Sequence, residues 1–324
     1  MPLTHYPYGV SSFGAPIFPG VPFGGQSNFY YVDAINGNDG NSGTDPSQAF
    51  KTVAKGYAVL RSGYYDTLFL IGLGTAFPLT AQLVWAKNYT NLIGDTIPTL
   101  VSQRARITNG TALLTPMIDF TATGVYVANI QMANYGSDAT GALLGVRLNG
   151  AQRCRFDNCH IAGMGGATTA TETGGRSLVL TNDASENVFS NCAIGLDTVA
   201  RTAANYEIEF IAPACARNVF QDCTVLRYTT GSGNSGGFVK IDNNGIDRWV
   251  IFRNCIFMNS IVGGGAALTT GFVAGTAQAT GGYVLLKNCI SGGMTGLTGG
   301  SDTSLLVDFL PGAATSVLGL TPTS

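Results

Sequence analysis

One unit of this chain reads Asn187-Val188-Phe189-Ser190-Asn191-Cys192-Ala193-Ile194. In an unbroken strand, Phe189 and Asn191 would share one face, while Cys192 and Ile194 would share the opposite face. A left-handed bend at Asn191, which Asn tolerates better than most residues, shifts this alternation by one residue. Phe189, Cys192 and Ile194 can then all face the same core. We therefore predict two short strands joined by a sharp turn at Asn191.

The same unit recurs through the second half of the chain, each time with Asn or Asp directly before Cys. The pairs are Asn158-Cys159, Asn191-Cys192, Asp222-Cys223, Asn254-Cys255 and Asn288-Cys289, with spacings of 33, 31, 32 and 34 residues. A fixed period of this size is typical of solenoids, in which each unit buries its inner face only by stacking on its neighbours. The apolar residues recur every two positions rather than every 3.6, and the units are rich in Val, Phe, Thr and Gly. This pattern favours strands over the helical repeats of similar length.

The five repeated cysteines define a structural ladder of turn and core residues. Equivalent side chains of adjacent coils stack about 4.8 Å apart, and Cys packs as a small hydrophobic residue. The chain has seven cysteines and lacks paired CxxC motifs. We therefore expect buried thiols, with no disulfide framework, no bound metal and no cofactor. Such a ladder is expected in a protein that folds in a reducing compartment.

Composition and hydropathy narrow the range of partners. Charged residues make up 11% of the chain and the net charge is −2, so we expect no nucleic-acid partner. The sequence has no run of 18 apolar residues, and residues 1–25 lack the basic and apolar regions of a signal peptide. These observations predict no membrane partner and assembly in the cytoplasm.

The two ends of the chain differ from the repeats. Residues 1–28 form a Pro-rich, nearly uncharged segment that we interpret as an attachment arm. Residues 29–66 predict a cap strand, a turn and a helix over about Val53–Leu60 capped by Thr52, which would cover the open end of the solenoid. The solenoid itself is predicted over residues 67–300, and residues 301–324 as a C-terminal cap or assembly tail.

The stretch Tyr31-Val32-Asp33-Ala34-Ile35-Asn36-Gly37-Asn38-Asp39, followed by Ala49-Phe50-Lys51-Thr52-Val53, resembles the opening of proteins with the pectate-lyase-like fold. Together with the repeats, the resemblance extends over residues 29–295. It implies an all-β, right-handed parallel β-helix with a short N-terminal capping helix and extended terminal arms. Pectate lyases, glycoside hydrolases, phage tailspikes and virion spikes share this fold, so the resemblance does not define a function.

A second resemblance lies in the arm. The string Tyr6-Pro7-Tyr8-Gly9-Val10-Ser11-Ser12-Phe13-Gly14 looks like the start of small phage virion proteins. It implies that the arm, with Tyr6, Pro7, Tyr8 and Phe13, attaches the protein to a major capsid protein or another virion protein. The protein would then be located on the virion surface after assembly in the host bacterial cytoplasm.

A catalytic site would need a pair of carboxylates if the protein were a glycosidase. The candidates are Glu207 and Glu209, two residues apart on one predicted strand and facing outward, and Asp242, one coil later and close to Glu209. The alternative is that these are solvated surface charges, which Arg201, Arg217 and Arg227 could pair with. Three aromatic residues could line a glycan groove beside these acids: Tyr206, Tyr228 and Trp249.

Two other polar features are candidate sites. The loop Asp33–Asp45 is rich in oxygen ligands, yet it lacks the EF-hand spacing, so we expect a structural turn, with a bound cation as the alternative. His5 lies in the arm and His160 would point outward at a bend, so neither is expected to be catalytic.

Three functions follow from these features. The first is a β-helical spike that decorates or cements a bacteriophage capsid, assembled as a homotrimer because flat, weakly charged sides can pack around a symmetry axis. The second is a tailspike or tail fibre that binds or depolymerises a host surface glycan as a hydrolase or lyase. The third, a secreted polysaccharide lyase, is disfavoured by the missing export signal. The sequence favours the spike, with no catalytic residue assigned.

Overall fold

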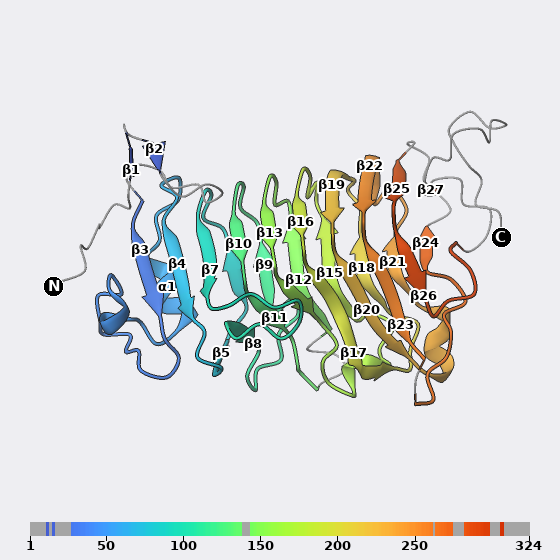
Figure 1. Cartoon of the computed structure of the whole chain (residues 1–324), viewed down its shortest axis with the longest axis horizontal. Coiled ribbons are helices and arrows are strands. Elements are labelled where there is room, and N and C mark those ends of the chain that lie inside the picture. Colours follow the sequence, from blue (N-terminus) through green and yellow to red (C-terminus); the bar gives the residue numbers. More distant parts are fainter. Residues whose placement is uncertain are drawn as a thin grey trace.

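A computed structural model describes residues 11–12, 15–16, 27–137, 143–261, 263–274, 282–298 and 305–307. Within these ranges the chain forms a long parallel β-solenoid whose strands stack along one axis, with β3 and β25 near opposite ends (Figure 1). The fold class predicted from sequence, an all-β parallel β-helix with a short N-terminal helix, is confirmed. Most of the two predicted terminal arms lies outside the described residues, and this part includes Tyr6, Pro7, Tyr8 and Phe13.

Three parallel sheets form the walls of the solenoid in the described part of the chain. Sheet 1 contains β3 (Phe29–Val32), β4 (Thr67–Ile71), β7 (Asn91–Asp95), β10 (Tyr126–Ala128), β13 (Arg155–Asp157), β16 (Val188–Ser190), β19 (Cys215–Gln221), β22 (Ile246–Arg253), β25 (Tyr283–Lys287) and β27 (Leu305–Val307). Sheet 2 contains β5 (Ala76–Pro78), β8 (Arg106–Thr108), β11 (Gln131–Ala133), β14 (His160–Ala162), β17 (Ala193–Arg201), β20 (Thr224–Thr229), β23 (Ile256–Ser260) and β26 (Ile290–Gly292). Sheet 3 contains β6 (Leu83–Trp85), β9 (Ile118–Phe120), β12 (Leu144–Asn149), β15 (Arg176–Thr181), β18 (Tyr206–Phe210), β21 (Gly237–Ile241) and β24 (Phe272–Ala274). The chain visits the sheets in the order 1, 2, 3, and each strand pairs with its equivalent in the next coil.

The remaining elements are short. β1 (Ser11–Ser12) and β2 (Ala15–Pro16) form an antiparallel pair, and the 3₁₀ turns are η1 (Pro46–Gln48), η2 (Thr169–Thr171) and η3 (Gly231–Ser235). The helix α1 spans Val53–Val59, and the side chain of Thr52 accepts a hydrogen bond from the Lys55 N–H at 3.2 Å. Its buried face, Val53 and Gly56, packs at the β3 and β4 end of the solenoid, so α1 covers the first coil. No helix in the described ranges is long and apolar enough to span a membrane.

The turn between sheets 1 and 2 is a two-residue corner with a left-handed first residue. The φ angles at this position are Asn129 59°, Asn158 50°, Asn191 52°, Asp222 55°, Asn254 52° and Asn288 51°. The Asn191 N–H donates to the Gln221 carbonyl of the next coil at 3.0 Å, and the Ala193 N–H donates to the Cys159 carbonyl of the previous coil at 2.9 Å. The corner is therefore hydrogen-bonded to the coils on both sides, which fixes the register between them.

Side chains of one kind form columns inside the solenoid. Phe156, Phe189, Phe220 and Phe252 are fully buried, and consecutive rings lie 4.8, 4.6 and 4.6 Å apart at 9°, 3° and 16°. Below the corners, the Cys192 Sγ–H donates to the Phe156 carbonyl of the preceding coil at 3.3 Å, and the other ladder cysteines repeat this contact. All seven cysteines are free thiols, and all but Cys289 are buried.

A second left-handed corner, which the sequence did not suggest, precedes or falls within the strands of sheet 1. Arg153, Glu186, Arg217 and Arg248 occupy it with φ of 54°, 61°, 55° and 65°. Glu186 pairs with Arg153 at 2.8 Å and with Arg217 at 2.7 Å, so the ion pairs join three successive coils. Asn and Gly mark left-handed positions in a sequence, whereas Arg and Glu do not.

Candidate functional site

The three candidate carboxylates lie along sheet 3, where strand alternation decides which way each points. On β18, Ile208 and Phe210 face the core, which places Glu207 and Glu209 on the outer side of the sheet. The expectation that both point outward holds, but the expectation that they are solvated is wrong. Glu207 is 0% exposed and Glu209 is 5% exposed, because connecting loops pack over this part of the sheet.

Glu207 is the centre of a fully buried charge cluster. Its carboxylate accepts a hydrogen bond from Ser177 Oγ of β15 at 2.6 Å and pairs with Arg201 Nε at 3.3 Å and Arg227 Nη1 at 3.6 Å. Both guanidinium groups also donate hydrogen bonds to backbone carbonyls. Arg201 donates to Met164 and Gly163. Arg227 donates to Gly237, Ala203 and Gly233. Burial lowers the pKa of Arg227 to about 10, although the Glu207 carboxylate opposes this shift. The cluster therefore ties three connecting loops to the outer face of sheet 3.

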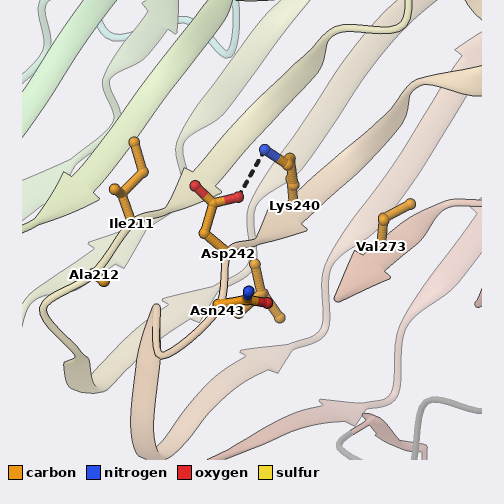
Figure 2. Close-up of a pocket in the computed structure, with 7 residues that line it drawn as sticks. Ile211, Ala212, Lys240, Asp242, Asn243 and Val273 are labelled. Atoms are coloured by element: carbon orange, nitrogen blue, oxygen red, sulfur yellow. Dashed lines mark ion pairs between the residues drawn. The ribbon is translucent and has the colours of Figure 1, made fainter. Parts of the chain in front are cut away.

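Glu209 is held between two cations. Arg176 donates to its carboxylate at 2.7 and 3.1 Å, and Lys240 of β21 donates at 2.7 Å. Register pairs Glu209 with Lys240 and not with Asp242, which follows two residues later, one coil from Glu209 as the sequence suggested. Lys240 instead lies between the two acids, 2.7 Å from Asp242 (Figure 2). Burial alone would lower the pKa of Lys240, but its hydrogen bonds to Asp242 and Glu209 raise it.

A shallow groove of about 370 Å³ borders the ion-paired residues Arg176, Glu209, Lys240 and Asp242. Its lining residues are Ile211, Ala212, Lys240, Ile241, Asp242, Asn243 and Val273. These residues lie at or just after the ends of β18 and β21, together with Val273 of β24. Figure 2 shows the Lys240 and Asp242 side chains pointing toward each other among them. None of the candidate tyrosines and tryptophan lines the groove. Tyr206 instead stacks on the Arg176 guanidinium, 5.0 Å from its ring centre, and is buried.

The arrangement does not match what glycoside hydrolysis needs. That reaction uses one carboxylic acid and one carboxylate that flank a bond of the substrate and reach it directly. Glu207 is enclosed by protein, and Glu209 and Asp242 share Lys240 as a counter-charge. Of the arginines proposed as partners, Arg201 and Arg227 pair with Glu207, while Arg217 pairs with Glu186 on another face.

The Asp33–Asp45 loop uses its carboxylates as caps for backbone N–H groups. Asp33 accepts from the Ile35 and Asn36 N–H groups, and Asp39 accepts from the Lys51 and Thr52 N–H groups at 2.8 and 2.9 Å. These hydrogen bonds lower the pKa of both acids, although burial alone would raise it. The described residues contain no group of three or more His, Cys, Asp or Glu arranged to hold a metal ion.

The other residues singled out from the sequence lie at the corners, in the core and on the outer face of sheet 2. The corner residues Asn158, Asn191, Asp222, Asn254 and Asn288 turn outward, and the Asn288 side chain donates to Asn254 and that of Asn254 to Asp222, at 3.3 and 3.0 Å. Cys159, Cys192, Cys223 and Cys255 are buried, and Cys289 is half-buried. His160 does point out of sheet 2, but it is 1% exposed because a loop covers it.

Comparison with known proteins defines the class of fold. The chain is a right-handed parallel β-helix similar to a pectin methylesterase solved with a hexasaccharide, with a TM-score of 0.58 and 13% identity over 91% of this chain and 94% of the other. It is also similar to a rhamnogalacturonan lyase, with a TM-score of 0.53 and 16% identity over 81% of this chain and 68% of the other. A third similar structure is the pectin methylesterase of Aspergillus niger, with a TM-score of 0.50 and 17% identity over 89% of this chain and 85% of the other. At these identities the likeness shows the fold alone. No family model and no curated protein matches the chain.

The sequence analysis offered Arg201 and Arg227 as partners for the acids, but it did not anticipate Ser177 or the burial of the cluster around Glu207. Ser177, Arg201 and Arg227 lie on three different strands, 24 to 50 residues apart, and only the stacking of coils brings them together. The one available signal was the scarcity of charge: in a chain with 11% charged residues, arginines inside strand patterns are expected to have buried partners.

Proposed function

We propose that this chain is a bacteriophage structural protein, a β-helical spike that decorates or cements the capsid. The proposal includes a homotrimer, attachment to the major capsid protein or another virion protein through residues 1–28, and assembly in the host bacterial cytoplasm. The observation that carries it is the state of the candidate carboxylates: Glu207, Glu209 and Asp242 each pair with a cationic side chain. These acids therefore serve the folded structure rather than a reaction.

Two further observations support the proposal. The ladder of free, buried thiols is compatible with folding in a reducing cytoplasm. The string from Tyr6 to Gly14 resembles the start of small phage virion proteins. The solenoid is also continuous along its axis, because each inner coil is hydrogen-bonded to the coils on both sides.

The experiment is to purify virions from a host that produces the chain and to measure its abundance relative to the major capsid protein by quantitative mass spectrometry. A fixed ratio of many copies per particle is expected. Deleting residues 1–28 should remove the protein from particles while leaving the solenoid folded by circular dichroism. Retention of the truncated protein would reject the arm as the attachment segment, and absence of the full chain from particles would reject the virion role.

A second candidate function is binding or cleavage of a host surface glycan, which the groove at Lys240 and Asp242 favours. Sugar hydroxyls can pair with both the ammonium and the carboxylate. If the purified protein depolymerises bacterial surface polysaccharide and Glu209→Ala abolishes this activity, the structural proposal is overturned. If it binds without cleaving, Lys240→Ala should weaken binding more than Lys87→Ala, which changes a lysine near α1.

A further inference from the structure

A long insertion interrupts the regular corners between sheets 1 and 2. After β7 ends at Asp95, residues 96–105 precede the start of β8 at Arg106, whereas the corners at Asn129, Asn158 and later coils have two residues. The inserted loop runs across the outer face of sheet 2 toward later coils (Figure 1). It turns Ile97, Leu100 and Val101 to solvent, with exposures of 83%, 49% and 41%. An apolar loop projecting from the solenoid is a potential contact element.

The loop is fixed to sheet 2 by buried polar contacts. Gln103 is 0% exposed, and its Nε2 donates to the Asn158 carbonyl at 2.6 Å, two coils away, and to the Thr99 carbonyl at 2.7 Å. The Ser102 N–H, at a left-handed residue with φ 55°, donates to His160 Nδ1 at 3.1 Å. The segment 99–103 is thus held at two adjacent points.

The contacts of His160 define its protonation state. Its Nε2 lies 2.9 Å from the Gly195 carbonyl, which can only accept, so this nitrogen carries the proton. Nδ1 is then the acceptor for the Ser102 N–H, and the Gln131 amide nitrogen lies 3.2 Å from it. The geometry therefore requires the neutral imidazole.

A second proton on Nδ1 would oppose this arrangement. It would point at the Ser102 N–H, which now donates to Nδ1, and at the Gln131 amide. Gln131 Oε1 is buried without a hydrogen-bond partner among the described residues, so rotation of the amide could satisfy the new N–H. The Ser102 N–H could not be satisfied in the same way, because a backbone group cannot rotate.

Other ionisable groups lie around His160. Asp197 on β17 favours the imidazolium, the Tyr135 hydroxyl contacts Gln131, and Arg106 is the register partner of Gln131 on β8. Burial of the ring outweighs the effects of the Gly195 carbonyl and Asp197 and lowers the pKa of His160.

We propose that His160 is a pH-sensitive latch, which holds the loop of residues 96–103 on sheet 2 while neutral and releases it when protonated. Release would let the loop, with its exposed apolar residues Ile97, Leu100 and Val101, move away from sheet 2. The inference is independent of the virion proposal, since it concerns the loop and sheet 2 alone.

The direction of the pH effect follows from linkage. The released loop leaves His160 in water with a pKa of about 6.5, and the closed loop lowers that pKa. The closed state is therefore fully favoured above about pH 6.5 and loses stability as the pH falls from there to the lowered pKa. Within this window the ratio of open to closed loop should rise by up to about tenfold per pH unit.

Hydrogen–deuterium exchange of a peptide that contains residues 96–103 tests the latch, once the intrinsic pH dependence of exchange is divided out. The wild type should show the rise, while His160→Asn should not, because the Asn carbonyl can replace Nδ1 as an acceptor that does not titrate. His5→Asn is the matched control, since His5 is the only other histidine of the chain. It should behave as the wild type.

Loop exchange that is independent of pH in the wild type would overturn the proposal, and so would an equal rise in His160→Asn. If His160→Asn does not fold, titration of the two histidines of the wild type by NMR gives the answer alone. One imidazole must titrate below about pH 6.5, together with the amide signal of Ser102. Two imidazoles titrating at or above that value would reject the latch.

Discussion

Replacing Glu207 with Gln tests whether the buried carboxylate supports the fold. Glu207→Gln keeps the shape and one acceptor for Ser177, but leaves two guanidinium groups in a fully buried site without a counter-charge. Breaking a buried ion pair by removing one partner costs about 3–5 kcal/mol. With an unfolding entropy of about 2.1 cal/mol/K per residue, the 324 residues give about 0.7 kcal/mol/K. The melting temperature should therefore fall by about 4–7 °C.

The matched control is Glu186→Gln. Glu186 also pairs with two arginines, Arg153 at 2.8 Å and Arg217 at 2.7 Å, but the three side chains are 31%, 62% and 40% exposed. Exposed pairs contribute about 0–1 kcal/mol each, so losing both should leave this variant melting within about 3 °C of the wild type. Differential scanning calorimetry measures both. Equal melting temperatures for the two variants would refute the reasoning, because burial is what distinguishes the two sites.

Three further predictions concern the corners and columns. Asn191→Ala should lower the free energy of unfolding by about 1–2 kcal/mol, because Ala is strained at the left-handed φ of this exposed residue. Asn191→Gly should lower it by much less, because Gly adopts this φ freely, and urea titration distinguishes the two variants. Cys215 and Cys192 should resist iodoacetamide in the native protein at mildly alkaline pH and react only after unfolding. Burial raises the pKa of Cys215 to about 12 and that of Cys192 well above its usual value, so neither is a thiolate at that pH. Rapid labelling of the native protein, seen by mass spectrometry, would contradict this. Phe189→Ala should cost about 3–5 kcal/mol in urea, since the ring is buried and stacked on both faces, and a loss below 1 kcal/mol would show that the column relaxes to fill the space.

The corners could be located in the sequence because their causes are local. Asn is one of the few residue types that readily adopt a left-handed φ, as Asn191 does, and the nearby Phe189 and Cys192 must both reach the core. The period then repeats because stacking forces each coil to place the same residue at the same corner. The helix after Thr52 could be predicted because its cause is also local: the capping residue lies directly before the helix.

The charge cluster and the loop over sheet 2 could not be derived in this way. Glu207 looks like any strand residue that faces outward, and its burial depends on how the loops from three coils fold over it. His160 likewise was expected at an open bend, but a loop inserted two coils earlier covers it. In a solenoid, the inner face is determined by the repeat, while the outer face depends on insertions that differ from coil to coil.

The two-residue corner has a consequence for the dimensions of the molecule. Because each corner is hydrogen-bonded only to the coil before it and the coil after it, one coil can be gained or lost without altering the geometry of the others. Each such change alters the length by about 4.8 Å, the spacing between neighbouring strands. The length of the solenoid can therefore change only in steps of one coil. Duplication of a stretch of about 32 residues would extend the distance between its two ends in fixed increments, with the chemistry of either end unchanged.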